Sequence, residues 1–173
     1  HEHRRQRQMC IRDSSPIPPL DAMKAFFKGK FFYQLYFQTP GVAEAEFDKD
    51  VRTALRKFYH MASGELDLST LVEKSADDDM LTSLTDPDKM GDWLTADDLG
   101  FYVNEFTQSG FAGPLNYYRN HNLTWELNAN KPTEIHQPAL FVAGERDGVI
   151  AMAGPALESM PNFVKDLRTN VLI

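Results

Sequence analysis

The stretch PALFVAGERD, from Pro138 to Asp147, decides the fold class of this 173-residue chain. Its middle part, residues 139–143, is an unbroken apolar run that a proline opens and a glycine closes. Short runs of this kind are typical of strands that are buried on both faces of a parallel sheet. The stretch therefore predicts a core strand with the acidic residue Asp147 at its carboxyl end.

The residues after this strand predict the remainder of one crossover unit. We expect a short helix at about 151–160, stopped by Pro161, and a second strand at 169–173. A helix that joins two strands in this way is the usual crossover between parallel strands of one sheet. Since two strands do not form a stable sheet alone, residues 137–173 are expected to be the C-terminal part of a larger α/β core.

The section before the strand, residues 15–136, predicts a mainly helical domain. Its clearest helix is expected at 42–62, and a second helix should begin at Thr95, whose hydroxyl can accept a hydrogen bond from the backbone N–H near Asp98. The first helix carries one apolar stripe at helical spacing, formed by Phe47, Val51, Leu55 and Phe58.

A polar stretch at 73–91 lies between the two expected helices and contains an acidic run at 77–79. The run lacks the alternating spacing and the closing glutamate of a calcium loop. It therefore predicts a solvated loop rather than a metal site.

The first fourteen residues have a different origin from the remainder. RRQRQMCIRDS, from Arg4 to Ser14, matches a translation of the transposase adapter that is used in sequencing libraries. We expect residues 1–14 to be foreign to the natural protein and disordered, so that its true N-terminus is not seen.

The composition of the chain limits the classes of protein and of binding partner that are consistent with it. The chain is 42% hydrophobic and 12% aromatic, which is sufficient for a sizeable core. A net charge of −7 argues against a nucleic-acid partner. No apolar run approaches the roughly 20 residues that a transmembrane helix needs. We expect a cytoplasmic protein with no membrane span and no nucleic-acid partner.

Two aromatic stretches carry the strongest functional signal. They are YQLYFQTPGVAEAEF, from Tyr33 to Phe47, and SGFAGPLNYYRN, from Ser109 to Asn120. Together they resemble the lid of the epoxide hydrolases of the α/β-hydrolase fold, and PALFVAGERD resembles the strand that delivers the catalytic acid in that fold. The resemblance covers about residues 15–173. It implies a helical lid over 15–136 and part of the core over 137–173.

This resemblance implies that the intact enzyme hydrolyses a small-molecule epoxide to a vicinal diol, and the aromatic residues around Tyr33 favour an apolar substrate. Opening an epoxide places negative charge on its oxygen, so the enzyme needs a nucleophile at carbon and a hydrogen-bond donor at the oxygen. In this family two lid tyrosines hold the epoxide oxygen while a core aspartate attacks carbon, and a His–Asp pair then hydrolyses the ester. A phenol suits this role because it is a neutral, strong donor at pH 7. No cofactor or metal is expected.

The resemblance places these roles on particular residues. The two lid tyrosines fall on Tyr33 and Tyr118, and the acid of the charge relay falls on Asp147. Gln34, which follows the first tyrosine as in the family's YQ pair, is expected to bind substrate. The nucleophilic aspartate and the catalytic histidine have no counterpart in this chain, so we expect the polypeptide itself to be inactive.

The residues alone leave other interpretations open. Tyr33 could be a core aromatic, Tyr117 competes with Tyr118, and Asp147 could simply cap the segment that follows it. Three residues also depart from the family pattern: Tyr117, Ala112 and Gly148.

Three functions therefore remain under consideration. The first is an epoxide hydrolase. The second is a haloalkane dehalogenase or another α/β hydrolase, which would share the aspartyl-ester chemistry but hold a halide with Trp or Asn. The third is a non-enzymatic helical binding module. The paired tyrosines favour the first.

Overall fold

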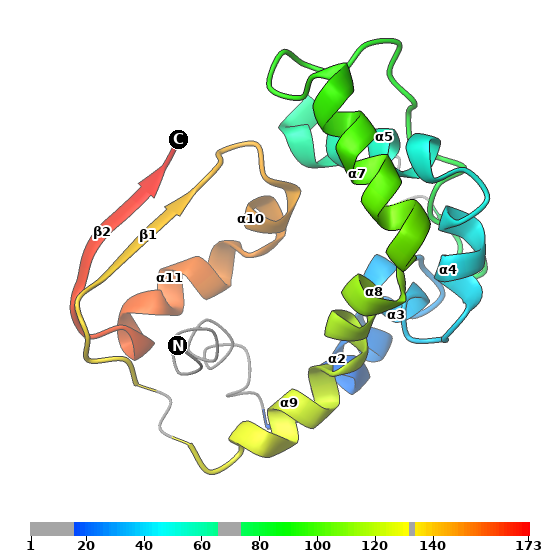
Figure 1. Cartoon of the computed structure of the whole chain (residues 1–173). Helices are drawn as coiled ribbons and strands as arrows, with labels where there is room; N and C mark the ends of the chain where they lie inside the picture. Colours follow the sequence, from blue (N-terminus) through cyan, green and yellow to red (C-terminus); the bar gives the residue numbers. More distant parts are fainter. Residues whose placement is uncertain (1–15, 66–73, 132–133) are drawn as a thin grey trace. The chain divides into compact units, whose positions relative to one another are not determined.

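The computed structural model describes residues 16–65, 74–131 and 134–173, which form two compact units. One unit, Leu20–His121, is helical, and the other comprises residues 16–19 and Asn122–Ile173 and contains two strands (Figure 1). A mainly helical part is thus followed by a strand–helix–strand part, as predicted. The prediction for residues 1–14 lies outside the described residues.

The helices of the described chain are short, and none of them is long and apolar enough to cross a membrane. Helix α7 lies beside α5 within the helical unit (Figure 1). The elements up to the first strand are α2 (Pro19–Phe26), α3 (Tyr33–Tyr36), α4 (Val42–Phe47), α5 (Val51–His60), the π-helical turn η2 (Met61–Glu65), α7 (Ala96–Ser109), α8 (Ala112–Arg119) and α9 (His121–Asn128).

The single helix predicted at 42–62 is wrong, because the chain forms α4 and α5 with a break between them. Asp50 has non-helical backbone angles, and its carboxylate accepts a hydrogen bond from the backbone N–H of Thr53 at 3.0 Å. This side-chain cap starts a new helix. The apolar stripe nevertheless faces one core, in which Phe47 and Leu55 are buried and Val51 and Phe58 pack against them.

The predicted start of the second long helix is confirmed. The Thr95 hydroxyl accepts a hydrogen bond from the Asp98 N–H at 3.1 Å, and the Asp98 carboxylate accepts one from the Thr95 N–H at 3.1 Å. These reciprocal bonds satisfy two backbone donors that a helix start otherwise leaves unpaired.

The core of the helical unit is built around Phe47, which is 1% exposed. The rings of Phe37, Phe58 and Phe111 meet its ring edge to face, with centroids at 6.0, 5.0 and 5.3 Å. Such edge-to-face contacts add to the free energy of apolar burial. The other buried apolar members of this core are Phe31, Ala43, Ala54, Leu55, Met80, Leu84, Leu94, Leu99 and Leu115.

The described part of the polar stretch, residues 74–91, was predicted to be a solvated loop. Several of its backbone and side-chain groups are instead bonded to the helical unit or buried. The Glu46 carboxylate accepts hydrogen bonds from the Tyr36 hydroxyl at 2.7 Å and from the N–H groups of Met80 and Leu81 at 3.2 and 2.6 Å. Lys74 is buried, and its ammonium lies 4.5 Å from the centroid of the Phe31 ring. The acidic run at 77–79 is nevertheless exposed, as expected.

The second unit forms the predicted crossover. Strand β1 (Ala139–Ala143) pairs in parallel with β2 (Leu167–Leu172), and the connection contains α10 (Gly148–Met152) and α11 (Gly154–Phe163) (Figure 1). Pro161 does not stop the helix where predicted. It lies in the last turn of α11, where a missing N–H removes only one hydrogen bond before the helix ends.

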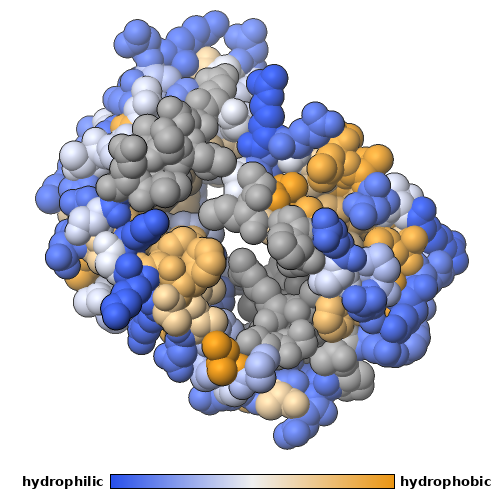
Figure 2. All heavy atoms as spheres, turned by 180° about the vertical axis from the view of Figure 1, so that it is seen from behind, coloured by the Kyte–Doolittle hydropathy of each residue, from blue (hydrophilic) through white to orange (hydrophobic). Residues whose placement is uncertain are grey.

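The prediction that β1 is buried on both faces is wrong for the described chain. Ala139, Phe141 and Ala143 are half-buried on one face, whereas Leu140 and Val142 are exposed on the other. Val171 of the neighbouring strand, which pairs with Val142 and so lies on the same face, is exposed as well. Figure 2 shows hydrophobic atoms on the surface in the region of these strands. The sheet therefore presents one uncovered apolar face.

The central position of Phe47 leads to a stability prediction. We expect Phe47→Ala to lower the free energy of unfolding by about 3–5 kcal/mol, because it removes a ring from a packed core and leaves a cavity. Phe101→Ala is the matched control, since Phe101 is 62% exposed on α7 and should cost far less. Urea denaturation of the full chain measures both. Equal losses would contradict the position of the core.

Candidate active site

The two predicted lid tyrosines lie in direct contact, although they are 85 residues apart in the sequence (118 − 33). Tyr33 begins α3, Tyr118 lies in α8, and both are half-buried. Their ring centroids are 5.7 Å apart with an interplanar angle of 84°. The helical unit therefore brings together two of the three residues to which the sequence assigned catalysis.

A third ring connects this pair to the core. Phe37 is buried, and its ring centroid lies 5.7 Å from that of Tyr33 and 5.2 Å from that of Tyr118. The neighbouring Tyr117 is 55% exposed, and its ring centroid lies 5.6 Å from that of Tyr118. Of the two adjacent tyrosines, Tyr118 is thus the one that packs against Tyr33.

Gln34 lies beside the first tyrosine, as its sequence position suggested. It is 3% exposed, and its Nε2 donates a hydrogen bond to the Tyr33 hydroxyl oxygen at 2.8 Å. Among the described residues, its Oε1 is buried and has no hydrogen-bond partner. Because the phenol oxygen accepts the amide bond, the hydrogen of the phenol can be donated to another oxygen.

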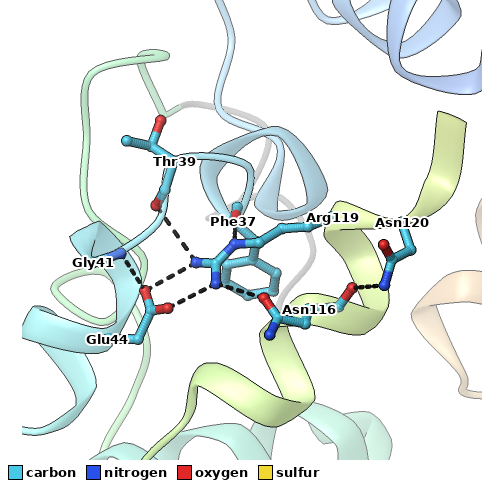
Figure 3. A network of polar contacts seen from close by, with 7 residues as sticks. All are labelled: Phe37, Thr39, Gly41, Glu44, Asn116, Arg119 and Asn120. Atoms are coloured by element: carbon cyan, nitrogen blue, oxygen red, sulfur yellow. Dashed lines mark hydrogen bonds and ion pairs between the residues drawn. The ribbon is translucent and has the colours of Figure 1, made fainter. Parts of the chain in front are cut away.

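Arg119 joins the two tyrosine-bearing segments (Figure 3). It bonds bidentately to Glu44, with Nη1 to Oε1 at 2.7 Å and Nη2 to Oε2 at 2.9 Å. Its Nε donates to the Phe37 carbonyl at 2.8 Å, and its remaining N–H groups reach Asn116 Oδ1 at 3.0 Å and the Thr39 carbonyl at 3.5 Å. All five guanidinium donors therefore have acceptors.

Gln38 makes a second connection between the same segments. Its Nε2 donates to the carbonyl of Gln34 at 2.7 Å and to the carbonyl of Tyr118 at 3.1 Å. One amide thus joins α3 directly to the second tyrosine.

The Glu44 carboxyl is held in its charged form. The hydrogen bond from Arg119 is the largest influence that keeps its pKa below the ordinary value of 4.5, and the backbone N–H of Gly41 adds a bond at 2.9 Å. Gly41 has φ 85°, which a residue without a side chain adopts without strain, and α4 begins directly after it. A glycine turn and a charged carboxylate thus define the start of α4.

Asp147 lies in the other unit, in the segment that follows β1. It is exposed, and its carboxylate accepts a hydrogen bond from the Val149 N–H at 2.8 Å, which caps α10. The capping interpretation of this residue is therefore correct. Capping uses one carboxylate oxygen and leaves the other for a further donor.

The sequence analysis missed Arg119, Glu44 and Gln38. Arg119 does stand next to the tyrosine in the quoted GPLNYYRN, and both glutamate and glutamine lie within the first quoted stretch. No spacing rule pairs them, however, because Glu44 and Arg119 are 75 residues apart. Their presence inside the two lid stretches was the available signal.

Several known proteins of similar sequence are epoxide hydrolases. Epoxide hydrolase A of Mycobacterium tuberculosis is 36% identical over 137 residues, which cover 78% of this chain and 42% of that protein. Epoxide hydrolase 2 of Siraitia grosvenorii is 37% identical over 146 residues, which cover 83% of this chain and 44% of that protein. No protein-family model matches the chain.

Solved structures agree with the sequences. The crystal structure of Epoxide Hydrolase A from Mycobacterium thermoresistibile has a TM-score of 0.80 at 34% identity and covers 92% of this chain and 50% of that one. An epoxide hydrolase from an endophytic Streptomyces has a TM-score of 0.79 at 33% identity, with 88% and 47% covered.

These likenesses confirm the predicted fold class, which is that of part of an α/β hydrolase. Within that class, the chain is homologous to the epoxide hydrolases over most of its length. It spans less than half the length of the two relatives named above.

The lowered pKa of Glu44 leads to a pH prediction. Because the pKa is lower in the folded state, the ion pair contributes stability that is complete above about pH 4.5 and is lost as the pH falls through the folded-state pKa. We expect Glu44→Gln to lower the free energy of unfolding by about 1–3 kcal/mol at neutral pH. The difference from the original chain should shrink in acid.

Urea denaturation of both chains between about pH 7 and pH 3 measures this difference. A difference that is the same at both ends of this range would show that the charge of Glu44 does not stabilise the fold.

Proposed function

We propose that this chain provides the lid and the C-terminal part of the core of an enzyme that opens a small apolar epoxide to a vicinal diol. The contact between Tyr33 and Tyr118 carries the proposal, because two phenols from distant segments meet inside a chain that is homologous to epoxide hydrolases. The names of these relatives favour this function over a haloalkane dehalogenase or a binding module.

In this proposal the two phenols act on the epoxide oxygen. Each would donate a hydrogen bond to the oxygen as the carbon–oxygen bond breaks and negative charge develops there. Gln34 supports the role of Tyr33, since its amide donates to the phenol oxygen and so leaves the phenol hydrogen for the substrate. A donor of this kind is worth about 2.7–4 kcal/mol of transition-state stabilisation.

Asp147 would accept a hydrogen bond from the histidine that activates water for ester hydrolysis. Its place after the carboxyl end of β1 supports this role, because ligands of α/β sheets bind beyond this end of the strands. The nucleophilic aspartate and the histidine would come from the remainder of the enzyme.

The uncovered apolar face of β1 and β2 supports the assignment of residues 137–173 to a larger core. Leu140 and Val142 on this face would be buried by further parts of such a core, as the unbroken apolar run in the sequence indicates. The division at residues 136 and 137, and the cytoplasmic location, stay predictions.

A chimeric enzyme tests the function. Residues 16–173 replace the matching segment of Epoxide hydrolase A from Mycobacterium tuberculosis, which retains the rest of its own sequence. We expect this chimera to form diol from an aromatic epoxide. Tyr33→Phe and Tyr118→Phe should each lower kcat by about 10²–10³, because each removes one donor to the developing oxyanion.

Tyr117→Phe is the matched control, since it removes a hydroxyl from the adjacent, exposed tyrosine. It should leave kcat nearly unchanged. If Tyr117→Phe and Tyr118→Phe reduce kcat equally, the assignment of Tyr118 is wrong. A folded chimera that forms no diol would contradict the proposed activity itself.

A further inference from the structure

We propose that Arg119, together with Glu44 and Gln38, is a clamp that positions the two lid tyrosines relative to each other. None of these three residues is expected to touch the substrate. The catalytic meaning of the clamp rests on the proposed function, whereas its effect on the tyrosine pair does not.

The guanidinium of Arg119 is fully occupied by the protein. Its five N–H donors reach Glu44, Asn116 and the backbone carbonyls of Phe37 and Thr39 (Figure 3). A group without a spare donor cannot bind a substrate anion without breaking its own contacts. Its chemistry therefore suits the joining of segments rather than ligand recognition.

Several contacts of the clamp lie at the tyrosine-bearing helices α3 and α8, and the bond to Glu44 adds α4. Arg119 follows Tyr118 directly on α8, and Phe37, whose carbonyl it binds, follows the helix that Tyr33 begins. Gln38 contacts the backbone of α3 and the carbonyl of Tyr118 with a single amide nitrogen. The clamp thus spans the two segments on either side of the ring pair.

Ring contacts alone would not fix the two hydroxyl groups. Edge-to-face aromatic pairs are favourable over a range of centroid distances of about 4.5–7 Å. A catalytic constellation instead has to be held to within about 0.5 Å. The directional bidentate bond between Arg119 and Glu44 provides a constraint of that kind.

The burial of this ion pair sets it apart from another pair of the same unit. The side chains of Arg119 and Glu44 are 13% and 15% exposed, whereas those of Arg56 and Asp86 are 27% and 36% exposed. Arg56 also binds a backbone carbonyl, that of Pro87, so its ion pair and its carbonyl contact both lie at residues 86–87. Arg56 therefore provides a matched control for the loss of an arginine.

The test is an NMR measurement on the isotope-labelled full chain. Nuclear Overhauser effects between the rings of Tyr33 and Tyr118 report their separation, and urea denaturation reports overall stability. We expect Arg119→Met to abolish these ring-to-ring effects or weaken them severalfold. Arg56→Met should retain them, even where both variants lose stability. Glu44→Gln, which keeps the size of the side chain, should weaken them as well.

Unchanged ring-to-ring effects in a folded Arg119→Met or Glu44→Gln chain would overturn the proposal. Equal weakening by Arg56→Met would overturn it too, because the effect would then follow general destabilisation. Should Arg119→Met fail to fold, the comparison of Glu44→Gln with Arg56→Met decides. None of these outcomes depends on epoxide turnover, so failure of the clamp and failure of the proposed activity are separately visible.

Discussion

The packing of the Phe37 ring is the constraint on which the helical unit depends. This buried ring contacts Phe47 in the core on one hand and the rings of Tyr33 and Tyr118 on the other. Its backbone carbonyl is also an acceptor for Arg119. Because Phe37 packs against both the core and the two tyrosines, the position of the tyrosine rings depends on the packing of the core. The site is therefore only as well ordered as the core beneath it.

Polar groups help to shape the helical unit, because short helices are only marginally stable alone. Asp50 and the Thr95–Asp98 pair start helices, while Glu46 binds two backbone N–H groups of the segment near Met80. The bonds at Asp50 and at Thr95–Asp98 are exposed helix caps, whereas the Glu46 bonds satisfy partly buried backbone donors. The helical unit is thus an assembly of short segments, several of which are fixed by side-chain hydrogen bonds.

Local patterns in the sequence predicted what local physics decides. The apolar run of β1 and the Thr95 cap were correct because a few adjacent residues specify each. The break between α4 and α5 escaped prediction, since Phe47 and Val51 keep helical spacing across it. The site could be predicted only in part. The resemblance pointed to Tyr33 and Tyr118, but the bond between Glu44 and Arg119 depends on the tertiary fold.

The 75-residue separation of Glu44 and Arg119 also has a consequence during synthesis. Ribosomes add about 5–20 residues per second, so Glu44 is made roughly 4–15 seconds before its partner. During that interval its carboxylate has only water and neighbouring backbone donors, and the first tyrosine has no second ring against which to pack. The tyrosine pair therefore cannot form before α8 has been made, and a nascent chain arrested before α8 would lack it.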